Sequence, residues 1–332
     1  MLKYFLCPPL VAGTLALNTF NSSAAGTYAP MPVAITSFGA VTQSGWLYVY
    51  GGHKGKRHEY SSNEVSGAFV RLNLADGKTW EALPAAAPAQ SPVFVADANF
   101  IYRIGGMAAR NPEGQPNDVW SHDTAARFDL RTREWLPLPK LPAARSSHDG
   151  WIVDGKLYVI GGWNLCGDES AAIWATNALM LDLHSLNAQW QEIPQPFQRR
   201  GLCVAALGKK LYAIGGMDSD ASPTLAVSVL DTETGKWSDG PPLPAGKLKG
   251  FGNSACVVAG KLYVSGMSGI VWRLNVQADG WEEAGKLAAP RFFHRLVPGA
   301  DHQILALGGE SDEGKLRNIE IISLNQSTAK NP

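Results

Sequence analysis

The stretch that decides the fold is HDGWIVDGKLYVIGG, residues 148–162. It holds two apolar runs, HDGWIV and KLYVI, separated by Asp154-Gly155. Asp-Gly between apolar runs predicts a tight β-hairpin. Comparable turns are expected at Ala259-Gly260 and Leu207-Gly208, and the same unit continues with ALMLDL (178–183) and a strand that begins at Trp190. The unit therefore predicts a four-stranded antiparallel meander.

The glycine pair that ends this stretch recurs along the chain. Glycine pairs or near copies stand at Gly51-Gly52, Gly105-Gly106, Gly161-Gly162, Gly215-Gly216, Ser265-Gly266 and Gly308-Gly309, and lone tryptophans follow at Trp80, Trp135, Trp190, Trp237 and Trp281. A repeat period of roughly fifty residues predicts radially stacked sheets, because one such sheet cannot bury both of its faces alone. Glycine is tolerated in a strand where backbones approach closely or φ is positive, as where sheets converge on an axis. The tryptophan ring fills the space between neighbouring sheets, and its N–H needs a polar partner.

These features together resemble kelch repeats. The likeness rests on the glycine pairs, the tryptophans, the LPLPKLP run from Leu136 to Pro142 and the Arg145-Ser-Ser-His148 sequence, and it extends from about Tyr28 to Leu324. The resemblance implies an all-β fold, a kelch β-propeller, here with six blades. We expect this propeller to span residues 26–325 as one domain, followed by a polar tail over 326–332.

The last repeat lacks its tryptophan strand, and the N-terminus carries a substitute for it. The segment Thr27-Tyr28-Ala29-Pro30-Met31-Pro32 resembles Trp135-Leu136-Pro137-Leu138-Pro139, with Tyr28 at the tryptophan position. We expect this N-terminal strand to complete the last blade and close the ring, which would leave no open sheet edge.

Residues 1–25 are typical of a secretory signal peptide. A positive start at Lys3, an apolar stretch and the small residues Ser23-Ala24-Ala25 predict cleavage after Ala25, with a mildly apolar leader as the alternative. Pro8 and Pro9 argue against a membrane-spanning helix, and we expect no transmembrane segment elsewhere. The predicted location is therefore secreted or periplasmic. Without the leader, the cysteines are Cys166, Cys203 and Cys256, an odd number that predicts no disulfide framework.

Charge excludes one class of partner. The chain carries 29 Lys and Arg against 29 Asp and Glu, so no global basic field points to nucleic acid. In a meander, the connections between blades and the loops after each glycine pair share one face, which we call the rim. Long loops follow the first three glycine pairs (53–67, 107–125 and 163–176), and we expect them to form a wall beside the channel.

Basic residues are predicted at the mouth of the channel on this rim. The starts of the innermost strands carry Arg145 and His148, Arg199 and Arg200, Lys247 and Lys249, and Arg291 and His294. Blades three and six would face each other, so two Arg-x-x-His pairs would look across the pore and favour a carboxylate or phosphate ligand. The alternative is that each pair bonds neighbouring loop carbonyls. Glu310 and Arg317, beside the last glycine pair, are further candidates for ligand binding or for a surface ion pair.

We expect no metal or cofactor. Asp118, His122 and Asp123, with Glu113 nearby, have the side chains of a divalent metal site. A solvated polar loop is favoured because no spacing matches a known ligand pattern.

Three functions remain open from the sequence. The first is a secreted kelch propeller whose rim binds a small anionic, sugar-acid-like ligand or a partner protein, without catalysis. The second is an isomerase similar to the bacterial sialic acid mutarotases (N-acetylneuraminate epimerases), which would need a proton donor and an acceptor near the pore. That family places Glu and Arg after the fourth glycine pair, where residues 217–225 offer only Asp218 and Asp220. The third, a copper oxidase of the galactose oxidase type, is disfavoured because the chain has no Tyr-His dipeptide; the nearest approach is His58-Glu59-Tyr60.

Deletion of residues 26–34 tests the predicted ring closure. Because the segment would join the two ends of the ring, its loss should lower the stability of the whole domain rather than of one blade. We expect a single denaturant transition, followed by circular dichroism, to shift to lower urea with no separate early phase. A small early transition with an unchanged main transition would contradict the closure.

Overall fold

The computed structural model describes residues 28–322 and residue 324. The expected signal peptide and polar tail lie outside these residues. The described part is built of β-strands, with one short 3-10 helix, η1 (Ala300–His302). No helix within it is long and apolar enough to cross a membrane.

Six sheets follow one another along the described chain, and in each of them consecutive main strands pair antiparallel. The first sheet contains β1 (Gly39–Gln43), β2 (Trp46–Tyr50), β3 (Phe69–Asn73) and β4 (Trp80–Leu83). The second contains β5 (Val93–Ala96), β6 (Phe100–Ile104), β9 (Ala125–Asp129) and β10 (Glu134–Pro137). The third contains β11 (Asp149–Val153), β12 (Lys156–Ile160), β14 (Asn177–Asp182) and β15 (Gln191–Pro194).

The remaining sheets repeat this pattern. The fourth contains β17 (Cys203–Leu207), β18 (Lys210–Ile214), β20 (Val227–Asp231) and β21 (Lys236–Gly240). The fifth contains β22 (Ser254–Val258), β23 (Lys261–Ser265), β24 (Ile270–Leu274) and β25 (Trp281–Lys286). The sixth has three strands, β26 (Arg295–Pro298), β27 (Ile304–Leu307) and β30 (Ile319–Ile322).

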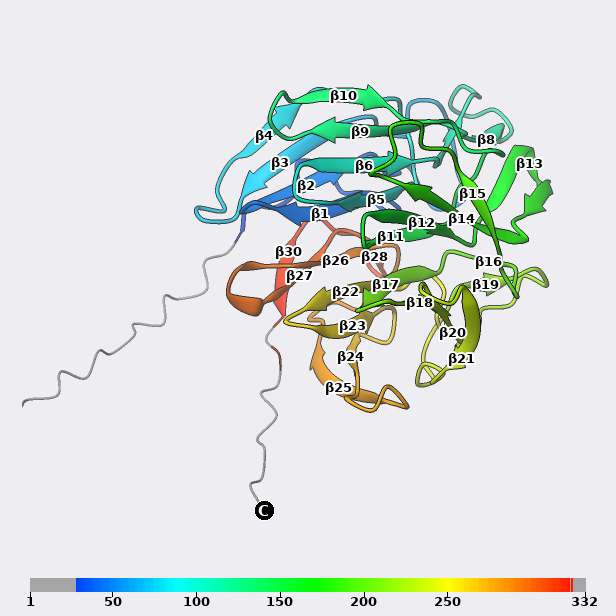
Figure 1. Ribbon diagram of the computed structural model, residues 1–332. Coiled ribbons are helices and arrows are strands. Elements are labelled where there is room, and N and C mark those ends of the chain that lie inside the picture. The colour runs from blue at the N-terminus through cyan, green and yellow to red at the C-terminus, as the bar shows by residue number, and fades with distance from the viewer. Residues whose placement is uncertain (1–27, 323, 325–332) are drawn as a thin grey trace, which may run out of the picture.

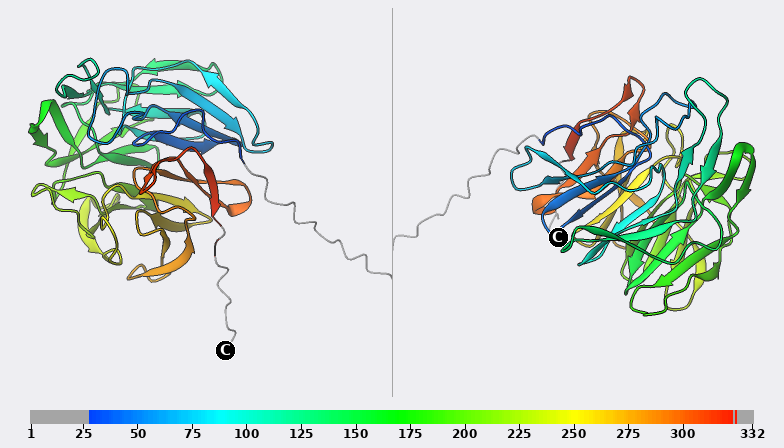
Figure 2. Two further views of the ribbon diagram at one scale, coloured as in Figure 1. Left: turned by 180° about the vertical axis from the view of Figure 1, so that it is seen from behind. Right: turned by 90° about the horizontal axis from the view of Figure 1, so that it is seen from above.

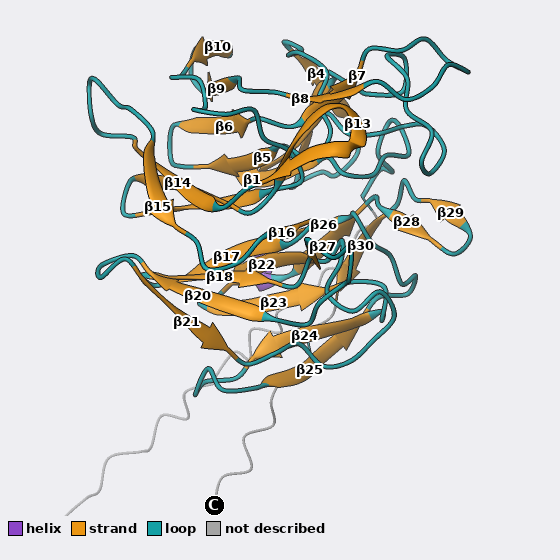
Figure 3. Ribbon diagram, turned by 90° about the vertical axis from the view of Figure 1, so that its right-hand side faces the viewer, coloured by secondary structure: helices purple, strands orange, loops and turns teal. Residues whose placement is uncertain are grey.

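Short accessory strands extend the loops that follow the glycine pairs. They are β7 (Met107–Ala109), β8 (Val119–Ser121), β13 (Trp163–Trp174), β16 (Arg199–Arg200), β19 (Met217–Asp218), β28 (Glu310–Ser311) and β29 (Gly314–Lys315). Figure 3 shows β7, β8, β13, β28 and β29 on one side of the molecule. The loops after the glycine pairs therefore share a face, as predicted.

The hairpin expected in the deciding stretch is confirmed. β11 and β12 pair from Asp149↔Ile160 to Val153↔Lys156, and Asp154 and Gly155 both have positive φ, as a two-residue hairpin turn requires. The Ala259-Gly260 turn also forms. The turn after β17 is Gly208-Lys209, one residue later than expected, because Leu207 still pairs with Lys210 in the ladder.

The first strands of the six sheets gather around a central axis (Figure 1). β1, β5, β11, β17, β22 and β26 each contact the next, and β26 also contacts β1. The last sheet lies beside the first in Figure 2. A cluster of buried apolar side chains fills the space between each sheet and its neighbour; Ile160, Val204 and Leu211, for example, join the third and fourth sheets. The core is thus divided among the contacts between sheets.

The glycine pairs sit where neighbouring backbones touch. In five of the six repeats the second glycine donates its N–H to a carbonyl of the segment that leads into the next sheet: Gly52 to Ala89 (2.8 Å), Gly106 to Arg145 (2.9 Å), Gly162 to Arg199 (2.8 Å), Gly216 to Gly250 (2.9 Å) and Gly309 to Ile35 (3.0 Å). Both residues of each of these pairs have positive φ. The expected reasons for glycine, close approach and positive φ, are both confirmed.

Each tryptophan N–H reaches a carbonyl of the preceding segment. Trp135 donates to Pro84 (2.9 Å), Trp190 to Pro139 (2.8 Å), Trp237 to Pro194 (2.7 Å) and Trp281 to Pro241 (2.9 Å). Trp80 donates in the same way to Pro30, at 3.0 Å. The N-terminal segment therefore contacts Trp80 of the first sheet in the same way that the end of each preceding sheet contacts the tryptophan of the next sheet.

From Tyr28 onward, within the described residues, the N-terminal segment forms no ladder with the last sheet. It contacts the sixth repeat through Met31 N to Arg317 O (2.8 Å) and Arg317 Nε to Met31 O (2.8 Å), without a ladder. Thr27, the first residue of the expected strand, lies outside the described residues.

A pair of glycine substitutions tests the close approach. Gly161 and Gly208 both have positive φ, but a Cβ at Gly161 would lie 2.6 Å from Arg199 O, whereas one at Gly208 meets nothing within 4 Å. We expect Gly208→Ala to cost about 1 kcal/mol and Gly161→Ala about 3 kcal/mol or more in urea unfolding, since only the latter adds overlap to backbone strain. Equal losses would show that φ alone selects glycine.

Candidate functional site

A cavity of about 340 Å³ opens on the rim, and we call it the rim cavity. Residues from the connections between sheets and from the loops after the glycine pairs line it together, as expected for a shared face. Its charged and aromatic lining residues are His53, Arg57, His58, Tyr60, Glu169, Arg200, Phe251, Phe292, Phe293 and Glu310.

The predicted wall beside the channel exists as a small separate core. β13 pairs with β8, and β8 with β7, so the loops of the second and third sheets form one accessory sheet. Trp163 and Leu165 pack there with Met107 and Val119, and Tyr60 from the first long loop joins them. The wall is therefore a packed structure that holds one side of the rim cavity in place.

Three of the predicted arginines are buried and bonded to the protein itself. Arg145 donates to Asn177 O (2.9 Å) and Asn177 Oδ1 (2.6 Å). Arg199 donates to the carbonyls of Gly215 (3.0 Å) and Ala226 (2.7 Å). Arg291, fully buried, pairs with Glu320 at 2.7 Å. Burial lowers the pKa of Arg145 and of Arg199 to about 10. These contacts match the alternative in which the arginines bond neighbouring groups.

The two predicted histidines are buried beside the axis. His148 Nε2 lies 3.1 Å from Ile104 O, so this nitrogen carries the proton, and His294 Nε2 lies 2.8 Å from Ser265 Oγ. Burial, assisted by Arg145, lowers the pKa of His148 to about 3, and burial lowers that of His294 well below its ordinary value. Both are therefore neutral at physiological pH. With Asn253 they line an axial cavity of about 40 Å³. The two Arg-x-x-His pairs do not jointly line the rim cavity, and ligand binding by them stays a prediction.

Arg200 differs from the other predicted arginines. Its guanidinium carbon stacks 3.9 Å from the Trp163 ring centroid and 5.4 Å from that of Phe251. Among the described residues its side chain has no hydrogen-bond or ion-pair partner, and its Nε is buried without one. Burial lowers the pKa of Arg200, and the charges of Glu169 and Tyr60 act in the opposite direction. A guanidinium that is held by aromatic rings and lacks a partner is prepared to bind an anion.

The other predicted residues have separate positions. Glu310 lines the rim cavity and pairs with Arg57 at 2.9 Å, not with Arg317, which bonds Met31 O. Lys247 pairs with Asp312 at 2.7 Å, and both side chains are exposed. Lys249 is exposed and does not line the rim cavity.

Sequence reasoning placed the first long loop in the wall but missed its individual lining residues and the aromatic residues of the rim cavity. Phe251, Phe292 and Phe293 lie on the connections into the fifth and sixth sheets, and His53, Arg57 and Tyr60 come from the loop after the first glycine pair. The available signal was the Phe292-Phe293 pair inside the Arg291-to-His294 motif, where the matching pair in the third repeat is Ser146-Ser147.

A chain of backbone hydrogen bonds lies beneath the rim cavity. It joins one residue at the entry to each sheet: Ser91 N to Ser37 O (2.6 Å), Gly201 N to Ser147 O (2.8 Å), Gly252 N to Gly201 O (2.9 Å), Phe293 N to Gly252 O (2.7 Å) and Ser37 N to Phe293 O (3.0 Å). All six residues have positive φ. We call these residues the entry ring.

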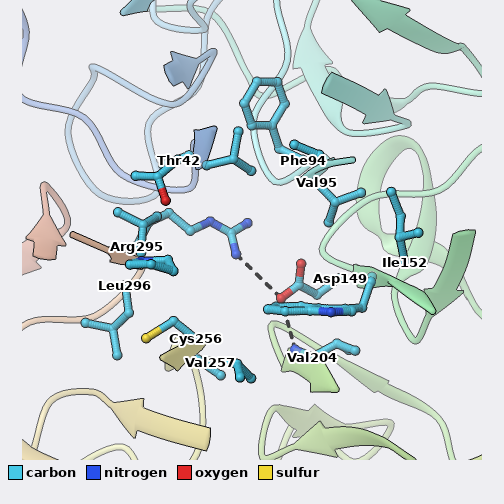
Figure 4. A pocket seen from close by; sticks show the side chains of 18 residues that line it. Thr42, Phe94, Val95, Asp149, Ile152, Val204, Cys256, Val257, Arg295 and Leu296 are labelled. Atoms are coloured by element: carbon cyan, nitrogen blue, oxygen red, sulfur yellow. Dashed lines mark hydrogen bonds and ion pairs between the residues drawn. The ribbon is translucent and has the colours of Figure 1, made fainter. Parts of the chain in front are cut away.

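The far half of the channel holds a second cavity, of about 200 Å³ and largely apolar. Figure 4 shows Arg295 and Asp149 pointing toward one another across it. Arg295 Nη1 lies 3.5 Å from Asp149 Oδ2, which also accepts a hydrogen bond from Val204 N at 3.0 Å. The pair links the first strands of the third and sixth sheets.

The candidate metal and thiol residues lie outside the lining of the rim cavity. Within the described residues, no group of three or more His, Cys, Asp or Glu side chains is arranged to hold a metal ion, and Asp123 pairs with Lys140 at 2.9 Å. Cys203 and Cys256 are buried, and burial raises the pKa of both thiols. Cys166 is half-buried.

The sheets around an axis and the loop-lined rim define a kelch-repeat β-propeller. A family model, the KLHDC2/KLHL20/DRC7 Kelch-repeats domain, matches residues 37–267, and the chain belongs to this kelch-repeat family. Among solved structures, one titled "Structure of YjhT" superposes with a TM-score of 0.70 at 18% identity, covering 90% of this chain and 99% of that one. This likeness concerns the fold.

Curated relatives share the kelch repeats. Kelch-like protein terF of Aspergillus terreus is 25% identical over 248 residues, which are 73% of this chain and 51% of that protein. Kelch repeat and BTB domain-containing protein 12 of Danio rerio is 26% identical over 274 residues, 76% of this chain and 42% of that protein. The chain thus spans about half the length of these relatives.

Two arginine substitutions separate a structural cation from a binding one. Arg291→Met leaves the Glu320 carboxylate without its buried partner, and we expect a loss of about 3–5 kcal/mol in urea unfolding. Arg200→Met removes only ring stacking, so the expected loss is about 1 kcal/mol or less. If Arg200→Met proved as destabilising as Arg291→Met, Arg200 would be a structural residue as well.

Proposed function

We propose that the rim cavity binds a small carboxylate ligand, of the sugar-acid type, through Arg200. The observation that carries this proposal is the partnerless guanidinium of Arg200, fixed between Trp163 and Phe251 at the cavity wall. Arginine presents a planar set of donors that matches a carboxylate. The rim cavity, about 340 Å³, lies within the range of roughly 300–1,000 Å³ usual for small-molecule sites.

The surroundings of Arg200 suit a polar ring compound. Three phenylalanines supply apolar surface, while Glu310, Tyr60 and Gln90 supply hydrogen-bonding groups around it. Arg57 adds a second cation, but its pairing with Glu310 leaves it less available. A partner protein that inserts an acidic side chain at the same rim is the alternative occupant.

A mutarotase-like isomerase is the second candidate function. Opening and closing a sugar ring needs a proton acceptor and a proton donor. Glu310 and Tyr60 line the same cavity and have side chains suited to these two roles. Burial raises the pKa of Tyr60, which keeps its phenol protonated. Faster exchange between sugar anomers in the presence of the protein, measured by NMR, would distinguish this function from simple binding.

We also propose that six sheets act as the blades of a closed ring and that the protein is exported. Support for closure comes from contacts between the last and first repeats: Gly309 N to Ile35 O and Ser37 N to Phe293 O, both 3.0 Å. Support for export comes from the leader-like residues 1–25. A mature protein that begins at Gly26, detected by mass spectrometry, is expected; an intact Met1 on exported protein would contradict cleavage.

A melting screen tests the ligand proposal. A ligand that binds only the folded state must raise the melting temperature. We expect sugar acids such as D-glucuronate and N-acetylneuraminate to raise it, matched neutral sugars not to, and Arg200→Gln to abolish the shift. Lys209→Gln, in the turn after β17 and outside the rim cavity, is the control and should keep the shift. No shift with any acid would contradict the proposal and favour a protein partner.

A further inference from the structure

Phe293 occupies a backbone position that its side chain does not suit. The other members of the entry ring are serines or glycines: Ser37, Ser91, Ser147, Gly201 and Gly252. Phe293 has φ of 50°, in the left-handed region, where a bulky residue is an outlier. A residue that breaks a local rule obeyed by its equivalents marks a functional or strained site.

The side chain of Phe293 lies between two cavities. It lines both the rim cavity and the axial cavity beneath it. Its ring meets Phe251 edge-on, with centroids 5.1 Å apart, and its centroid lies 5.0 Å from that of Phe292. A serine or glycine there would supply no comparable surface. Phe293 therefore forms the bottom of the rim cavity on its side of the axis.

Phe293 and Arg200 are connected through Phe251. The Arg200 guanidinium carbon lies 5.4 Å from the Phe251 centroid, which lies 5.1 Å from the Phe293 centroid. These separations are comparable with the size of a six-membered ring that bears its carboxylate directly. An anion held by Arg200 would thus bring an attached ring over the phenylalanines.

We propose that Phe293 is a specificity-determining residue: the aromatic floor of the rim cavity, which selects carboxylates attached to a ring over carboxylates without one. The inference rests on the proposed function, since Arg200 must hold the anion. Flat apolar surface favours a ring placed against it through burial and aromatic contact. The floor thereby adds selection by shape to the charge recognition of Arg200.

The test compares acetate with cyclohexanecarboxylate, which carry the same charge and differ by the ring. Dissociation constants are measured by ligand-observed NMR titration. We expect the wild-type protein to prefer cyclohexanecarboxylate by about tenfold. In Phe293→Ser this preference should fall to about threefold or less, because only Phe251 and Phe292 remain against the ring, while acetate binds as before. Its melting temperature should stay near that of the wild type, because three entry-ring positions already carry serine.

Ser147→Gly is the matched control, since it changes the equivalent backbone position of another repeat without touching the rim cavity. Loss of the preference in this variant, or its retention in Phe293→Ser, overturns the inference. If Phe293→Ser does not fold, Phe293→Leu keeps apolar volume without a flat face. A drop in the preference of at least about threefold is then expected, and an unchanged preference overturns the inference.

The two proposals fail differently. Equal binding of both probes by the wild type, abolished by Arg200→Gln, overturns the role of Phe293 and leaves the carboxylate site standing. Failure of the wild type to bind either probe overturns the carboxylate site, and the inference with it.

Discussion

The structure depends on one constraint, the close approach of neighbouring backbones around the axis. At the glycine pairs, a left-handed backbone lets an N–H meet a carbonyl of the next sheet, as in Gly106 to Arg145 O and Gly162 to Arg199 O. The acceptors include residues of the basic motifs themselves. The same contact therefore fixes the backbone positions of Arg145 and Arg199. It also holds their side chains close to carbonyls that no strand satisfies.

This constraint explains why most of the basic motif residues serve the fold. A chain entering a sheet leaves carbonyls that no strand satisfies, and buried carbonyls need donors. The guanidinium of Arg199 bonds two of them, Gly215 O and Ala226 O, while Arg145 bonds Asn177 O. Arg200 follows Arg199 directly but points to the aromatic wall, where no such carbonyl accepts it. The neighbour of a structural arginine is thus the residue free for binding.

The fold could be predicted from the sequence because its signals are local and repeated. Asp154-Gly155, the glycine pairs and Trp190 each act within one repeat or between adjacent ones, and the structure follows them. The N-terminal segment shows the limit of such analogy. Tyr28 to Pro32 contacts Trp80 and Arg317 through individual hydrogen bonds, without the regular ladder that the pattern implied for these residues.

The candidate site could be predicted only in part, because it depends on which side chains are not already bonded to other groups of the fold. The sequence pointed to the rim and included Arg200 and Glu310, which line the rim cavity, but it could not show that Arg291 is neutralised by Glu320, twenty-nine positions away. The Phe292-Phe293 pair is visible in the sixth repeat, but nothing in the sequence shows that Phe293 lines the rim cavity.

The two ends of the channel differ in their charged side chains, because the residues at equivalent positions differ from repeat to repeat. Equivalent first-strand positions carry Asp149 in the third sheet and Arg295 in the sixth, and these charges meet each other across the far cavity. A cation and an anion that pair within the channel leave little net field there for a charged guest. On the rim side, Arg200 has no such partner among the residues that the structure describes. The proposed recognition of an anion therefore belongs to the end of the channel where a cation is left unpaired, above the entry ring rather than along the axis.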